Sequence, residues 1–109
     1  MRWDFCVENS GDRPLPYGLA LHPFFLRHGA DRFDGGAGDL GLYASPEFAR
    51  LVVYTPANAP WFCLENQTSS TDCHNLYAAG LQNAANLQLV APGQCHRTWV
   101  EFRFSLQAH

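Results

Sequence analysis

The chain has 109 residues, of which 47% are hydrophobic, 14% aromatic and only 16% charged, and its formal net charge is -3. This length supports one small domain. The seven basic residues, all arginine and scattered along the chain, form no basic stripe that would bind nucleic acid or an anionic membrane. The chain has no run of about 18 apolar residues, which is the length needed to cross a bilayer. Because the N-terminus also lacks the apolar run of a signal peptide, we expect a cytoplasmic protein whose four cysteines are reduced.

Alternating apolar and polar residues predict an all-β domain with roughly six or seven short strands. In the first strand, Trp3, Phe5 and Val7 alternate with polar residues, which is typical of a half-buried antiparallel strand. In chain order, the expected strands cover residues 3–8, 15–22, 49–55, 61–65, 86–91 and 98–105. We expect the segment 28–45, rich in glycine and aspartate, to be mostly loop, and 75–86 to hold at most a short helical turn. The expected fold class is therefore an antiparallel β-sandwich, or part of one.

The second expected strand carries a histidine at its end. Alternation along an extended chain puts the bulky side chains on one face and only small residues and His22 on the other. A nearly bare face leaves room for a ligand beside an imidazole, which gives or takes a proton near neutral pH. The alternative is a histidine that simply ends a strand at the protein surface.

The expected strand 61–65 combines a carboxylate with an aromatic ring. Trp61, Cys63 and Glu65 point to one face of this strand. A sugar site uses such a pair, because the ring covers the apolar face of a pyranose while the carboxylate takes a hydroxyl proton. The alternative is an exposed glutamate at the end of a strand.

Several sequence motifs occur along the chain in the order of a known family. They are a Gly-x-x-x-His-Pro-aromatic strand in 14–25, a strand ending in Tyr-Thr in 51–56, a glutamate strand in 61–68, and an Asp-x-x-Asn segment in 72–76 that precedes a Leu-x-x-Pro-Gly turn in 89–93. Together they resemble the aldose 1-epimerase (galactose mutarotase-like) family. The resemblance covers the middle and C-terminal parts of a family member, and it implies a partial galactose mutarotase-like supersandwich.

The resemblance also implies roles for individual residues. His22 corresponds to the general acid, which protonates the ring oxygen of the sugar, and Glu65 to the general base, which deprotonates the anomeric hydroxyl. Asp34 matches an aspartate that binds sugar hydroxyls, and Trp61 is a further candidate for contact with the substrate. The expected substrate is an aldose, a hexose such as galactose or glucose, and no cofactor or metal is required. We expect His22 and Glu65 to lie on adjacent strands and to enter one concavity.

Two features keep other interpretations open. The family's second active-site histidine and its arginine, which come from the N-terminal part, have no counterpart here, so a non-catalytic carbohydrate-binding or vestigial domain is the main alternative. A truncated sandwich also leaves strand edges exposed, and on that ground we expect either a homodimer or a chain that is marginally folded when alone.

A zinc site is a third class that the cysteines and histidines bring into question. Cys63, Cys73-His74 and Cys95-His96 contain suitable ligands, but they lack a CxxC pair and fall in different expected strands and loops. The sequence therefore does not favour a zinc module of that composition.

Overall fold

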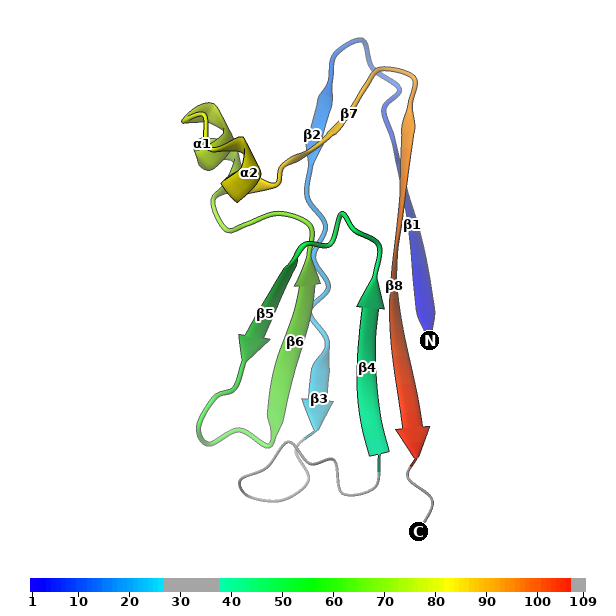
Figure 1. Ribbon diagram of the computed structural model, residues 1–109, viewed down its shortest axis with the longest axis vertical. Helices are drawn as coiled ribbons and strands as arrows, with labels where there is room; N and C mark the ends of the chain where they lie inside the picture. The colour runs from blue at the N-terminus through cyan, green and yellow to red at the C-terminus, as the bar shows by residue number, and fades with distance from the viewer. Residues whose placement is uncertain (27–37, 107–109) are drawn as a thin grey trace.

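A computed structural model of the chain describes residues 1–26 and 38–106 (Figure 1). Within this part, the chain forms eight strands and two short helices. The strands are β1 Arg2–Glu8, β2 Leu15–Tyr17, β3 Phe24–Leu26, β4 Gly38–Ala44, β5 Arg50–Tyr54, β6 Trp61–Gln67, β7 Gln88–Val90 and β8 Cys95–Leu106. The helices are α1 Cys73–Ala78 and α2 Gln82–Ala85.

The strands form three antiparallel sheets, with the orders β1-β8-β4, β3-β6-β5 and β2-β7. Figure 1 shows the two three-stranded sheets beside one another, with the β2-β7 ribbon and both helices toward one end of the molecule. The fold is thus all-β, antiparallel and sandwich-like, as the sequence predicts.

The core lies where the two three-stranded sheets meet. Phe48, Val100 and Phe102 are buried there, and partly buried apolar side chains from both sheets pack against them. Phe25 of β3 stacks on Phe62 of β6 and meets Phe102 of β8 edge to face, with ring centroids 5.4 and 5.8 Å away. These rings join the sheets, and they occupy one face of β3 and β6, so the opposite face of those strands remains for the site.

The prediction that 28–45 is mostly loop is wrong for 38–44, which form strand β4, whereas 28–37 lie outside the described residues. Strand β4 pairs with β8 over its whole length, and the register sets Leu40 opposite Phe104 and Leu42 opposite Phe102. The side chains of Leu40 and Leu42 pack against the core. Burial of these alternating leucines against a long neighbouring strand outweighs the low strand propensity of Gly41 between them.

The expected strand 15–22 is divided in the structure, and His22 lies outside any strand. Strand β2 pairs with β7, whereas Ala20 forms an isolated bridge with Gln67, and β3 then pairs with β6. The chain therefore changes partners near Gly18. Pro23, which lacks an N–H group, interrupts the ladder just before β3 begins.

The cysteine prediction is also corrected. A disulfide joins Cys6 of β1 to Cys95 of β8, so these two are not reduced thiols, while Cys63 and Cys73 are free. The register explains the pairing, because Cys6 lies opposite Arg97 and Cys95 opposite Glu8, which makes the two cysteines diagonal neighbours on one sheet face. Among the described residues, no helix has the length and apolar character needed to cross a membrane.

Candidate active site

Strand register brings His22 to Glu65. The bridge between Ala20 and Gln67 and the pairing of Phe24 with Cys63 belong to one antiparallel register, although the ladder is interrupted between them. In that register, His22 is directly opposite Glu65. Residues directly opposite each other share a sheet face, so the imidazole and the carboxylate meet on the face that does not pack against the core.

Hydrogen bonds hold the chain before His22 against the end of β6. The hydroxyl of Thr68 accepts the N–H of Leu19 at 2.9 Å, and the backbone N–H of Thr68 donates to the Leu19 carbonyl at 2.9 Å. The N–H of Leu21 donates to the Asn66 carbonyl at 3.0 Å. These bonds continue the alignment of the two segments up to the residue before His22.

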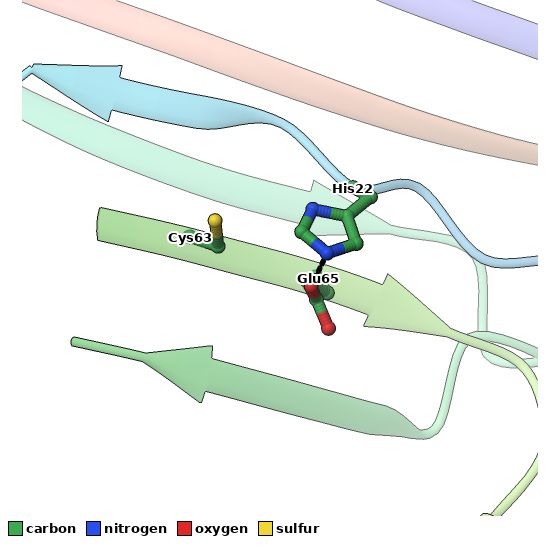
Figure 2. Close-up of side chains that lie close together, drawn as sticks. All are labelled: His22, Cys63 and Glu65. Atoms are coloured by element: carbon green, nitrogen blue, oxygen red, sulfur yellow. Dashed lines mark ion pairs between the residues drawn. The ribbon is translucent and has the colours of Figure 1, made fainter. Parts of the chain in front are cut away.

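The two ionisable groups are in direct contact, as Figure 2 shows. The Nε2 atom of His22 is 2.6 Å from Oε1 of Glu65. Their environments differ, because the His22 side chain is 59% exposed and that of Glu65 only 10%. The carboxylate is thus fixed within the sheet, while the imidazole approaches it from the solvent side and has room to turn.

Aromatic rings extend from His22 along the same face. The imidazole stacks on Phe24 with a centroid separation of 4.9 Å, and Phe24 meets Trp61 edge to face at 4.9 Å. Tyr54 of β5 lies 5.8 Å from Trp61. Trp61 is four residues from Glu65 on one strand, about 13 Å at the usual rise. Trp61 therefore shares the face of Glu65 but lies well beyond direct contact with it, whereas Phe24 contacts the imidazole of the pair.

Cys63 completes the central part of this face. It is fully buried and lies two residues before Glu65 on β6. Burial raises the pKa of the Cys63 thiol, and the negative charge of the Glu65 carboxylate raises it further. The side chains of His22, Cys63 and Glu65 each offer a ligand atom within 4.8 Å of the others (Figure 2).

Of the remaining predicted residues, those that the structure describes are not at this position. Asp34 lies outside the described residues. The Nδ2 of Asn75 donates to Oδ1 of Asp72 at 2.7 Å where α1 begins, which is a structural contact. The zinc ligands considered from the sequence do not assemble, because Cys95 is bonded to Cys6.

Sequence reasoning missed Phe24 as a member of the site and missed the proximity of Cys63 to His22. The alternation that placed Glu65 on the face of Trp61 already included Cys63. The signal for Phe24 was the histidine motif itself, whose last position is an aromatic residue and is occupied here by Phe24.

Comparison with known proteins supplies a fold but no family. No protein-family model and no curated protein matches the chain. The crystal structure of the Slr1438 protein from Synechocystis sp. PCC 6803 is similar, with a TM-score of 0.78 and 18% sequence identity over 97% of this chain. The match covers 50% of Slr1438, so this chain spans about half the length of that protein. At this identity the likeness establishes the sandwich-like fold alone.

Proposed function

We propose that this protein is an aldose 1-epimerase-like protein that interconverts the α and β anomers of an aldose. The observation that carries the proposal is the contact between His22 Nε2 and Glu65 Oε1 on one sheet face. An acid and a base at one point are what opening and closing a hemiacetal requires. The order of motifs that resembles the aldose 1-epimerase family agrees with this chemistry.

The reaction needs two proton transfers and no redox change. Glu65 takes the proton of the anomeric hydroxyl while protonated His22 gives a proton to the ring oxygen. The C1–O5 bond breaks and C1 becomes an aldehyde. Rotation about the C1–C2 bond presents the other face of the aldehyde, and closure with both transfers reversed gives the other anomer. The side chains of His22 and Glu65 carry out both proton transfers, so the mechanism requires no cofactor.

The different exposures of the two groups suit this sequence of steps. The anomeric hydroxyl and the ring oxygen are both bonded to C1, so the acid and the base need to hydrogen-bond two oxygens of one carbon. Each catalytic group must come within about 3 Å of its oxygen. The sugar therefore replaces the His22–Glu65 contact: His22, which is exposed, turns away from Glu65, which stays fixed.

The expected substrate is a free hexose such as galactose or glucose. The Phe24 ring beside His22 offers an apolar surface to the C–H groups of a pyranose, and Trp61 extends that surface along β6. Asp34 is proposed to bind sugar hydroxyls by its match to the family motif. A cytoplasmic location, where free hexoses occur, is part of the same proposal, and it requires the Cys6–Cys95 disulfide to persist in a reducing compartment, where such bonds are rare.

The decisive experiment replaces the proposed base. We expect Glu65→Gln to slow catalysed anomer exchange about 10²- to 10⁴-fold, because the amide keeps the size of the side chain but cannot accept the proton. Exchange is measured by polarimetry of freshly dissolved α-galactose or α-glucose, with unfolding curves to establish that the variant is folded. Glu8→Gln, an exposed position on β1, is the matched control and should retain full activity. An unchanged rate in Glu65→Gln would remove Glu65 from the mechanism.

A non-catalytic carbohydrate-binding domain is the second candidate. It is favoured by the exposure of Phe24 and Tyr54, which are 61% and 51% exposed beside Trp61. Exposed aromatic rings bind sugars without turnover. Calorimetric titration of the same hexoses, compared with polarimetry, distinguishes the two candidates: binding with no acceleration of exchange identifies the binding domain.

A further inference from the structure

Three different ligand atoms converge beside the proposed catalytic pair. His22, Cys63 and Glu65 offer nitrogen, sulfur and oxygen, and these atoms all lie within 4.8 Å of one another. Figure 2 shows Cys63 and Glu65 on β6, with the imidazole of His22 above the carboxylate. The proposed anomer exchange uses the nitrogen and the oxygen, but it gives the sulfur no part.

The backbone explains this convergence. Cys63 and Glu65 are alternate residues of β6 and so share a face, and the register of β3 with β6 brings His22 opposite Glu65. Both residues of β6 are buried, whereas His22 is exposed. Two donors therefore have fixed positions, and the third can adjust its distance from them.

The donor set fits zinc better than a hard cation. Calcium and magnesium prefer oxygen ligands, whereas Zn²⁺ takes thiolate, imidazole and carboxylate in a tetrahedral arrangement, at about 2.3 Å for sulfur and about 2.0–2.2 Å for nitrogen and oxygen. Ligands in such a tetrahedron lie roughly 3.3 to 3.7 Å apart. The observed spacing, within 4.8 Å, needs adjustments of about 1 Å, which rotation of the Cys63 and Glu65 side chains together with movement of the exposed His22 would supply. A thiolate and a carboxylate also balance the two positive charges of the ion.

We propose that His22, Cys63 and Glu65 form a zinc site with three protein ligands, and that Zn²⁺ bound there excludes the sugar. Because the ion takes the nitrogen and the oxygen that would transfer protons, zinc acts as a reversible inhibitor of anomer exchange. The inhibition rests on the proposed function, whereas binding of the ion does not.

Cobalt substitution tests the site directly. Chelator-treated, metal-free protein is titrated with Co²⁺, and absorption spectra are recorded. A tetrahedral site with a cysteine ligand gives visible d–d bands and a sulfur-to-cobalt charge-transfer band, both of which Zn²⁺ abolishes by displacement. Cys63→Ser should lose the charge-transfer band, while Cys73→Ser, which changes the other free cysteine, should retain it. His22→Gln should weaken Co²⁺ binding more than about tenfold, because even loss of an outer-shell partner costs that much.

The inhibition is measured separately by polarimetry. Zn²⁺ should slow exchange by the unaltered protein, and Cys63→Ser, compared with its own metal-free rate, should need more than about tenfold more Zn²⁺ for the same fractional inhibition. Since Cys63 is buried, Cys63→Ala is made as a second variant, and unfolding curves show which of the two is folded.

The outcomes separate the two proposals. Co²⁺ spectra without a charge-transfer band, or with a band that persists in both Cys63 variants, overturn the zinc site. Absence of anomer exchange in the metal-free protein overturns the proposed function and leaves the spectra to decide the zinc site. Exchange that Zn²⁺ does not inhibit, with Co²⁺ bound through Cys63, overturns the competition between ion and sugar.

Discussion

At the scale of single residues, Thr68 determines where His22 lies. Its side chain is fully buried, and its hydroxyl accepts the Leu19 N–H while its backbone binds the Leu19 carbonyl. Leu19 is three residues before His22. A polar residue at the end of the strand that carries Glu65 thus aligns the segment that carries its partner.

Thr68→Val tests this positioning role. Valine has the shape of threonine without the hydroxyl, so the Leu19 N–H would lose its acceptor. We expect the free energy of unfolding to fall by about 1 kcal/mol, the usual net contribution of one hydrogen bond, because this bond is only part-buried. Anomer exchange should also slow, because His22 is held less firmly. Both are measured on one preparation, by urea denaturation and by polarimetry.

The chain offers a matched control in Thr98. It is 3% exposed, and its hydroxyl has no hydrogen-bond partner among the described residues. Thr98→Val removes a buried hydroxyl that binds nothing, so stability should stay the same or rise. Equal losses in the two variants would show that the Thr68 hydrogen bond contributes nothing specific.

At the scale of elements, the sequence predicts best what depends on neighbouring residues. Alternation placed Trp61, Cys63 and Glu65 on one face of a strand, and the structure confirms that strand as part of β6. The same reasoning failed at Gly38–Ala44, because only pairing with β8 makes a glycine-containing segment a strand. It also extended the second strand to His22, because the alternation of residues in the sequence is the same whichever strand a segment pairs with. The contact of His22 with Glu65 followed from the resemblance, not from periodicity.

The Cys6–Cys95 disulfide gives a prediction at this scale. The bond joins residues 89 positions apart, and cross-links that close long loops restrict the unfolded chain most. We expect reduction, or the Cys6→Ser/Cys95→Ser double variant, to lower the free energy of unfolding by about 2–4 kcal/mol. The measurement is thermal unfolding with and without reductant.

Thiol counting provides the control for this prediction. Protein unfolded without reductant should show free thiols at Cys63 and Cys73 alone, and reduction should add those of Cys6 and Cys95. The double variant should not respond to reductant. Four free thiols before reduction would contradict the disulfide and restore the expectation of a fully reduced chain.

At the scale of the whole molecule, the fold is elongated for a chain of this length. Its radius of gyration is 17.1 Å, against about 13 Å for a compact domain of this size. Several large apolar side chains on edge strands are more than half exposed, namely Phe24, Leu26, Leu51, Val53 and Tyr54. Slr1438, which has the same fold over this chain, has about as many residues again. A single copy of this chain therefore leaves apolar surface that a larger sandwich would cover.

From this surface we predict that the chain forms a homodimer in solution. An uncovered edge strand presents unpaired backbone groups beside apolar side chains, and such edges pair with other chains. Strand β5 is an edge of its sheet, with Leu51 and Val53 52% and 55% exposed, so lysine at both positions should shift the equilibrium toward monomer. Leu81→Lys, at a residue 54% exposed beside α2, is the control for added charge and should leave the dimer intact. Sedimentation over a range of protein concentrations measures the dissociation constant. A compact monomer with a sharp thermal transition at all concentrations would show instead that one chain closes its own sandwich.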